Sequence, residues 1–369
     1  MTIAVRSFAK INLGLYIGAR RADGFHDLRT VYQTIALHDV IRVSVVPSRR
    51  VEIVCQCDDP RVPLDSSNTC YRMAALVMEE LGAEGKVTIE IEKRLPVQGG
   101  MGAASSNAVA TMLALEKALT KLRASERPAL KKSLSVAQRL RLAAQVGSDL
   151  PLFVLGGTVL GVDRGEEVYP LADLKATPMV VVTPEIGVST PKAFAAWDAL
   201  VERETVHGRW SANGLRPRRT QMCAEEAAVG TRYQLTPSAS SDRMFSVGCA
   251  LSAWLGSNPD TGAPAATLIK SGGRVGNLSD LVRAGIENDF ERVVFSEFPE
   301  LRDMKRALER AGARYASLSG SGSTLYGLFG SAGEAAKAAE RLRKQRLKAV
   351  ATRTLTRREY WNRSLVVGR

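Results

Sequence analysis

The sequence has no long apolar run. Nowhere do eighteen apolar residues follow one another uninterrupted, so no membrane-spanning helix is predicted. The first stretch, MTIAVRSFAKINLGLYIGARR, is apolar in places, but Arg6 and Lys10 interrupt it and no small-residue cleavage site follows. We therefore expect no secretory signal peptide and predict a cytoplasmic protein.

Cysteine and histidine are scarce. The 369 residues include three histidines and five cysteines, an odd number that suits a reducing compartment better than a disulfide framework. Cys55 and Cys57 form a CxC pair with Cys70 nearby, which in principle could seed a metal site. No histidine lies near them and the pair follows the strand-like run VEIV, so strand or core cysteines are the favoured interpretation.

Acidic residues are too few to balance the basic ones. The formal net charge is +13, and residues 331–369 supply eight of these charges, with eleven Lys or Arg against three Glu. Within this segment AGEAAKAAERLRKQRLKAV has the spacing of an amphipathic helix. A nucleic-acid contact is one interpretation of the charges. A solvated helix face is favoured, because no aromatic residues are interleaved with them.

Apolar patterns alternate between strand and helix periodicity along the chain, and 369 residues are long enough for two domains. Residues 203–275 scatter Arg, Ser, Gly and Pro, so we predict an irregular insertion there, with one short helix at MFSVGCALSAWLG.

One strand and one helix matter most for function. In AKINLGLYI apolar residues alternate with polar ones, which places Lys10 and Asn12 on the same side of one strand. Further on, a helix is predicted from Ser106 to about Leu119, followed by an exposed polar connection, TKLRASERPALKKSLS.

A glycine-rich loop precedes that helix, in PVQGGMGAASSNAVA. Gly99, Gly100 and Gly102 can adopt positive φ and let the backbone approach a ligand closely. The free N–H groups of the helix start favour an anion, and Ser105 and Ser106 add hydroxyl donors. The loop therefore predicts phosphate binding. It is neither a P-loop, because GK[ST] is missing, nor a dinucleotide fingerprint, because the glycine spacing differs.

This loop resembles the phosphate loop of the GHMP kinases. FAKINLGL near the N-terminus and SLSGSGSTLYGLF near the C-terminus are similar to two further motifs of that superfamily, in the same order. The resemblance implies a two-domain α+β GHMP kinase fold, with an N-terminal domain over residues 1–175 and a C-terminal domain over residues 176–369. The active site is expected in the cleft between them. The resemblance also implies ATP and Mg²⁺ as cofactors, with ATP on the loop at residues 96–107 and Ser106 as a magnesium contact. The implied nucleotide-binding positions are Pro96, Gly99, Gly100, Met101, Gly102, Ala103, Ala104, Ser105 and Ser106.

Within the superfamily, AKINLGLYIGARRADGFHDLRTVYQTIALHD resembles one branch over almost its whole length. Its members phosphorylate the 2-hydroxyl of 4-diphosphocytidyl-2-C-methyl-D-erythritol in non-mevalonate isoprenoid biosynthesis. GSDLPLFVLGG, VSTPKAF and ENDFE also match this branch in type and order. The implied partner is therefore a small molecule, methylerythritol linked to cytidine diphosphate, and nothing predicts the oligomeric state.

The resemblance also implies roles for matching residues. Lys10 and Asp149 correspond to the catalytic pair, in which the carboxylate orients or deprotonates the hydroxyl and the ammonium stabilises developing charge. Phe25 and Phe194 correspond to the aromatic pair that sandwiches cytosine, and His26 to the reader of the base edge. The remaining substrate-binding positions are Asn12, Thr190, Ser319 and Gly320.

Three positions depart from the pattern of the branch, and two other functions stay open. Ala103 and Ala104 stand where glycine is common, and Phe25 stands where tyrosine is usual. The first alternative is another GHMP kinase, acting on homoserine or a mevalonate derivative. The DGFHD and STPKAF loops argue against it, because only a cytidine-bearing substrate needs two stacking aromatics. The second alternative, a basic nucleic-acid-binding protein, is less favoured.

Overall fold

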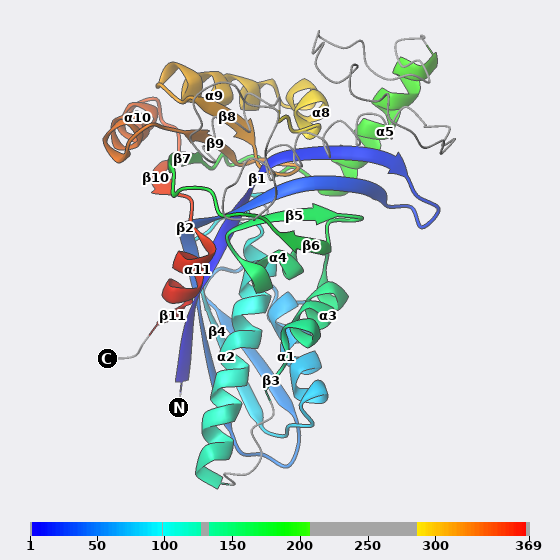
Figure 1. Cartoon of the computed structure of the whole chain (residues 1–369), viewed down its shortest axis with the longest axis vertical. Helices are drawn as coiled ribbons and strands as arrows, with labels where there is room; N and C mark the ends of the chain where they lie inside the picture. The colour runs from blue at the N-terminus through cyan, green and yellow to red at the C-terminus, as the bar shows by residue number, and fades with distance from the viewer. Residues whose placement is uncertain (1, 98, 127–132, 207–285, 367–369) are drawn as a thin grey trace, which may run out of the picture.

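The computed structural model describes residues 2–97, 99–126, 133–206 and 286–366. Most of the predicted insertion, including its short helix, lies outside these residues. Strands and helices alternate as expected for an α+β protein (Figure 1). The strands are β1 (Thr2–Arg20), β2 (His26–Val46), β3 (Glu52–Cys57), β4 (Lys86–Glu92), β5 (Thr158–Val162), β6 (Glu167–Pro170), β7 (Pro178–Val182), β8 (Tyr315–Leu318), β9 (Leu325–Leu328), β10 (Ala349–Arg353) and β11 (Leu365–Val366). The helices are α1 (Thr69–Glu80), α2 (Ala103–Glu126), α3 (Val136–Val146), α4 (Leu150–Leu155), α5 (Thr190–Val206), α8 (Phe290–Glu297), α9 (Pro299–Arg310), α10 (Ala332–Lys344) and α11 (Arg357–Ser364).

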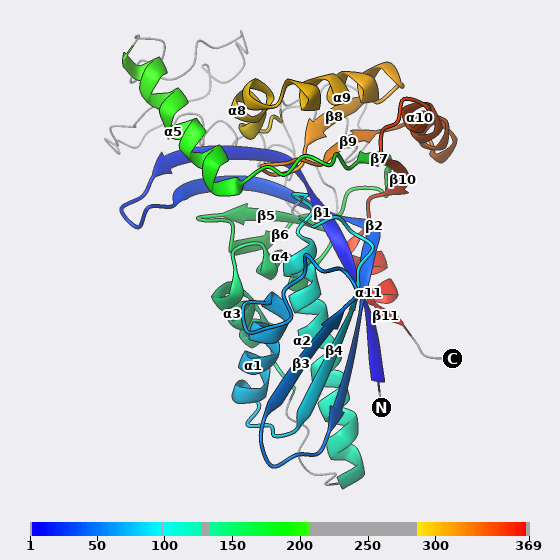
Figure 2. The same ribbon diagram turned by 180° about the vertical axis from the view of Figure 1, so that it is seen from behind.

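The first sheet has the strand order β11-β1-β2-β4-β3, and β5 and β6 extend it from β2. Helix α1 packs on β3 and β4 and helix α2 packs on β1 and β2, so the two helices cover one face of the sheet, and the other face is turned toward the viewer in Figure 2. Strand β4 shows why: Val87, Ile89 and Ile91 are buried and alternate with more accessible polar residues. A period of two puts its apolar side chains on one face, and that face lies under the helices.

Strands β1 and β2 form an antiparallel ribbon that is much longer than the other strands, with 19 and 21 residues. The ribbon starts in the first sheet and reaches past the second sheet to α5 (Figures 1 and 2). Its register shifts between Phe8 and Lys10 and again between Asn12 and Gly14. Such irregularities bend a strand and redirect its side chains. The two shifts lie on either side of Lys10 and Asn12, the polar residues predicted to share one side of the strand.

The second sheet has the order β10-β7-β9-β8 and packs against α8, α9 and α10. Its first strand, β7, begins at Pro178, close to the predicted domain division at residues 175 and 176. The end of the described chain returns to the first sheet, where α11 packs on β1 and Leu365 pairs with Val5. The predicted division itself stays a prediction.

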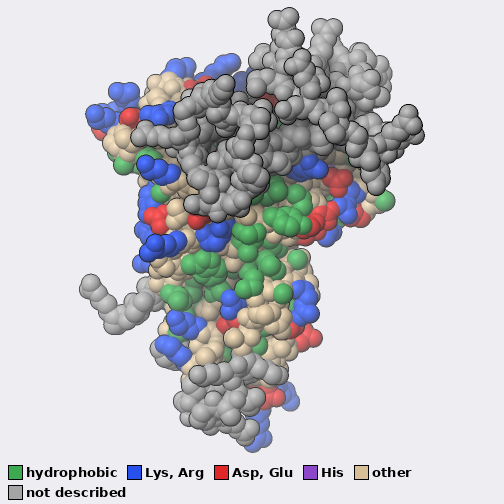
Figure 3. Space-filling view, viewed as in Figure 1, with side chains coloured by type: hydrophobic (Ala, Val, Ile, Leu, Met, Phe, Trp, Pro, Cys, Tyr) green, Lys and Arg blue, Asp and Glu red, His purple; other side chains and the backbone are tan. Residues whose placement is uncertain are grey.

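Helix α10 has the amphipathic character predicted from its sequence, but it ends at Lys344, and Ala349 and Val350 at the end of the predicted helix belong to β10. Ala335, Ala338, Ala339 and Leu342 are buried against the second sheet. Its lysines and arginines are exposed, and they gather at the corner of the molecule formed by α9 and α10 (Figure 3). This is the arrangement of a solvated helix face.

The extent of helix α2 differs from the prediction. The sequence pattern predicts an end near Leu119, but the helix runs from Ala103 to Glu126. Residues 120–126 are mostly polar, yet Lys, Leu, Arg, Ala and Glu are strong helix formers. Leu122 is also partly buried, and it packs against the same core as Leu119 one turn earlier. Helix propensity and the contact of Leu122 with the core together extend the helix beyond Leu119.

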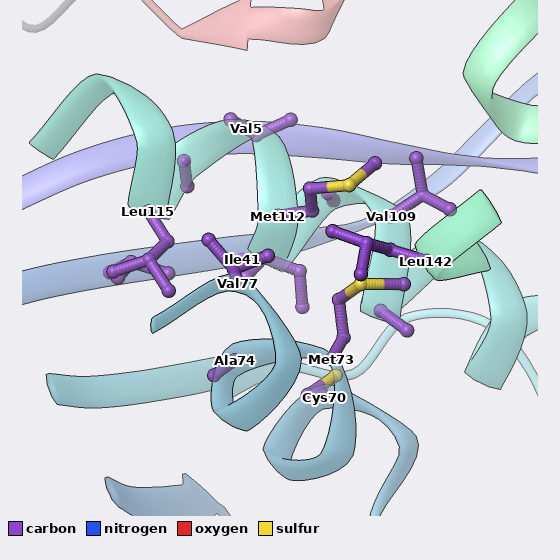
Figure 4. Close-up of a cluster of buried hydrophobic side chains, with 14 of the residues drawn as sticks. Val5, Ile41, Cys70, Met73, Ala74, Val77, Val109, Met112, Leu115 and Leu142 are labelled. Atoms are coloured by element: carbon purple, nitrogen blue, oxygen red, sulfur yellow. The ribbon is translucent and has the colours of Figure 1, made fainter. Parts of the chain in front are cut away.

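The core of the first domain lies between α1, α2 and the sheet. Helix α1 contributes Cys70, Met73, Ala74 and Val77, at the three- and four-residue spacing of one helix face. Figure 4 shows these side chains meeting those of α2 and of the ribbon. The residues labelled there include Val109, Met112 and Leu115 of α2 and Val5 and Ile41 of β1 and β2.

Substituting Met73→Ala tests this packing. Met73 is fully buried, so the change leaves a cavity, and the free energy of unfolding is expected to fall by about 2–5 kcal/mol. Chemical denaturation followed by circular dichroism measures the loss. Val136→Ala, at an exposed position of α3, is the matched control and should change stability by at most about 0.5 kcal/mol. Equal losses in the two variants would contradict the packing described.

Candidate active site

The centre of the site is a buried lysine on β1. Lys10 is 3% exposed, and its Nζ donates a hydrogen bond of 2.6 Å to Asn12 Oδ1. The same Nζ lies 3.4 Å from Oδ2 of Asp149, the residue that precedes α4. The strand pattern thus correctly placed Lys10 and Asn12 on one side, and the fold adds Asp149 from a distant part of the chain.

A tyrosine outside the predicted set completes this group. Tyr32 of β2 pairs with Asn12 across the ribbon, and its hydroxyl donates to Asp149 Oδ1 at 2.9 Å. The Lys10 ammonium lies 5.5 Å from the centre of the Tyr32 ring. Burial, followed by the nearby Asp149 carboxylate, raises the pKa of Tyr32 well above its usual value. The phenol therefore stays protonated and holds one carboxylate oxygen in place.

Residues of both domains form hydrogen bonds with the phosphate loop. Lys10 N donates to Met101 O at 3.0 Å, and from the second domain Ser319 Oγ donates to Gly100 O at 3.0 Å. Gly100 has a φ of 72°, and a Cβ there would collide with the carbonyl oxygens of Ser319 and Gly322. Glycine at this position is thus required both by conformation and by the close approach of the two loops.

Two cavities meet at the phosphate loop. One of about 660 Å³ is lined from both domains, and one of about 380 Å³ lies between the loop, the end of β4 and the start of α1. Gly100, Gly102 and Ser105 line both. The other predicted positions on the larger cavity are Lys10, Asn12, Phe25, His26, Asp149, Thr190, Phe194 and Gly320. Those on the smaller cavity are Pro96, Gly99, Met101, Ala103 and Ala104.

Two predicted site residues do not line either cavity. Ser319 is fully buried and bonds to the phosphate loop, as described above. Ser106 is 2% exposed, accepts from Ser7 Oγ at 2.7 Å and donates to Ala103 O at 3.1 Å. Their hydroxyls thus hold the loops in place, and the ligand contacts expected of them stay predictions.

The aromatic residues of the larger cavity are not arranged as a simple sandwich. Phe25 is 53% exposed and lies beneath the Arg164 guanidinium, 5.1 Å from the ring centre. Phe194 stacks on His26 instead, with ring centres 4.9 Å apart and an angle of 10° between the planes. Asp198, also absent from the predicted set, lies 2.7 Å from His26 Nε2. Asp198 follows Phe194 by four residues on the same helix, which puts both on one face, but nothing in the sequence indicated that this face meets His26.

Cys55 and Cys70 are buried, Cys57 is partly exposed, and Cys70 lines the smaller cavity. Burial raises the pKa of the Cys55 thiol to about 11 and that of Cys70 to about 12. Within the described ranges, no three His, Cys, Asp or Glu side chains come together as a metal site would require. Among the described helices, none is long and apolar enough to cross a membrane.

Comparisons with known proteins identify the family. Residues 68–157 match the GHMP kinases N terminal domain, and residues 265–348 match GHMP kinases C terminal. A 4-diphosphocytidyl-2-C-methyl-D-erythritol kinase of Solibacter usitatus (strain Ellin6076) is 33% identical over 325 residues, covering 88% of this chain and 80% of that protein. The chain belongs to the 4-diphosphocytidyl-2-C-methyl-D-erythritol kinase family. A member of this family from Heliobacterium modesticaldum (strain ATCC 51547 / Ice1) is 32% identical over 360 residues, which are 96% of each chain.

Solved structures agree with the family. The crystal structure of a 4-(cytidine 5'-diphospho)-2C-methyl-D-erythritol kinase is 27% identical with a TM-score of 0.59, and covers 95% of this chain and 98% of that one. Homoserine kinase from Cytophaga hutchinsonii, at 18% identity and a TM-score of 0.60, covers 96% and 95%. That second likeness shows the fold alone. The α+β GHMP kinase fold predicted from the motifs is confirmed, and the chain is a small-molecule kinase.

Replacing Gly100 by alanine tests the contact between the two loops. The added Cβ would push the phosphate loop away from Ser319, so phosphoryl transfer is expected to fall by at least about 100-fold, as misplacement of aligned groups does. Gly187→Ala is the control, because a Cβ there meets no atom within 4 Å and should leave activity unchanged. Full activity of Gly100→Ala would show that the loops need not touch. Steady-state kinetics of both variants measures the difference.

Proposed function

We propose that the protein transfers the γ-phosphate of ATP to the 2-hydroxyl of 4-diphosphocytidyl-2-C-methyl-D-erythritol. The names of its relatives support this substrate. The observation that carries the proposal is that the phosphate loop lines both cavities. A phosphate donor in one cavity and a phosphate acceptor in the other would meet at Gly100, Gly102 and Ser105. Phosphoryl transfer needs alignment and charge neutralisation more than covalent chemistry, and this geometry supplies alignment.

Asp149 and Lys10 would act on the acceptor. One carboxylate oxygen is held by Tyr32, and the other lies beside the Lys10 ammonium. A hydroxyl bound in the larger cavity would give its proton to this carboxylate as the phosphate approaches. The ammonium would stabilise the negative charge that develops on the transferring group. Asn12, bonded to Lys10 and to Thr30 Oγ1, keeps the lysine in position.

ATP would place its phosphates on the loop and the start of α2, with its base in the smaller cavity. The described residues offer magnesium no cluster of carboxylates, so the ion would take most of its ligands from the phosphates, as is usual for magnesium in kinases. Ser105, on the wall of both cavities, is the hydroxyl best placed to join them, whereas Ser106 would first have to leave its partners. Bound there, magnesium neutralises phosphate charge.

Asp149→Asn tests the base. The amide keeps the size of the side chain but cannot accept the proton, so kcat is expected to fall by about 100-fold or more, with KM for ATP little changed. Release of ADP is measured with ATP, magnesium and 4-diphosphocytidyl-2-C-methyl-D-erythritol. Asp303→Asn, at an exposed position of α9, is the matched control. Turnover of homoserine or mevalonate in place of this acceptor would overturn the proposed substrate and leave the kinase fold intact.

Tyr32→Phe tests the orientation of the carboxylate. The variant loses one hydrogen bond to Asp149, and kcat is expected to fall about 10-fold. KM for ATP should not change, because Tyr32 does not line the smaller cavity. A kcat equal to that of the wild type would show that Lys10 alone suffices to hold Asp149.

A further inference from the structure

The ring of His26 is fixed in both plane and rotation by a single helix. It is 6% exposed and stacks on Phe194, which in turn makes an edge-type contact with Phe290, with ring centres 5.0 Å apart. Its Nε2 lies 2.7 Å from Asp198 Oδ1. Phe194 and Asp198 are four residues apart on α5, so one turn of helix supplies both the stacking surface and the hydrogen-bond partner.

This contact decides which ring nitrogen carries the proton. An ionised carboxylate only accepts hydrogen bonds, so the proton of a neutral imidazole lies on Nε2. The other carboxylate oxygen of Asp198 lies 3.7 Å from Arg20 Nη1. Among the described residues, none forms a hydrogen bond with His26 Nδ1. In the neutral ring Nδ1 is then an acceptor, available to a ligand in the larger cavity that His26 lines.

We propose that Asp198 is a positioning residue that makes the site select a pyrimidine with an exocyclic amino group. This rests on the proposed function. An acceptor at Nδ1 complements the N4 amino group of cytosine, whereas the O4 carbonyl of uracil would place two acceptors together. Leaving a buried acceptor unpaired disfavours the wrong base by about 10- to 100-fold. Asp198 thus determines specificity through His26, without touching the reacting atoms.

The test compares two substrates in three proteins. kcat and KM are measured for the cytidylyl substrate and for its uridylyl analogue in the wild type, Asp198→Ala and Asp198→Asn. In Asp198→Ala we expect KM for the cytidylyl substrate to rise about 10- to 100-fold with kcat within about twofold, because ground-state and transition-state binding weaken together. The preference for cytidine should fall by the same factor. Asp198→Asn, whose Oδ1 still accepts from Nε2, should retain most of it.

One result would overturn the inference. It is an unchanged preference for cytidine in Asp198→Ala, whether kcat/KM falls equally for both substrates, as a purely structural role would give, or does not fall at all. Glu202→Ala, an exposed change one turn along α5, is the control and should behave as the wild type. Binding of cytidine diphosphate and uridine diphosphate by calorimetry gives the same comparison without turnover. A further outcome separates the inference from the proposed function. If the wild type does not turn over the cytidylyl substrate but binds cytidine diphosphate more tightly than uridine diphosphate, and Asp198→Ala loses this preference, the proposed function is rejected and the inference stands.

Discussion

The buried ammonium of Lys10 is the constraint on which the rest of the site depends. Moving such a charge out of water costs several kcal/mol unless it is paired and hydrogen-bonded. Asn12 and Asp149 supply the partners, and Tyr32 supplies an aromatic face. Gly102 also leaves room here: it has a φ of 65°, and a Cβ there would lie 3.0 Å from Phe153 Cζ and 3.1 Å from Lys10 Cγ. One charge therefore fixes the identity of residues on several separate segments.

The β1–β2 ribbon carries this constraint into both domains. Its first part belongs to the first sheet, and its second part contacts the elements of the second domain: Ile17 N donates to Asp289, and Tyr326 OH donates to Asn12 O. Because the ribbon is continuous, the lysine and the far end of the larger cavity are held at a fixed spacing. The phosphate loop is then fixed from two sides, by β1 and by the loop around Ser319.

The sequence predicted the parts of the site that have local signals. Alternation placed Lys10 and Asn12 together, and the glycine spacing marked the phosphate loop. The resemblance to the family, rather than any pattern, paired Lys10 with Asp149. Tyr32 and Asp198 have no such signal, because their roles depend on contacts between distant segments. In the sequence, one is an ordinary strand residue and the other is one of several acidic residues on a helix. The predicted α2 is too short because its polar end indicates a loop, whereas helix propensity prevails there.

The return of the chain to its first strand has a consequence for folding. Strand β11 pairs with β1 through Ala4 with Val366 and Val5 with Leu365, at opposite ends of the described chain. During synthesis the outer edge of β1 therefore has no strand β11 to pair with until almost the whole described chain has been made. Such an edge is a template for pairing with other chains. Pairing of β11 is therefore a late event, and the first sheet is completed only after the residues of the second domain have been synthesised.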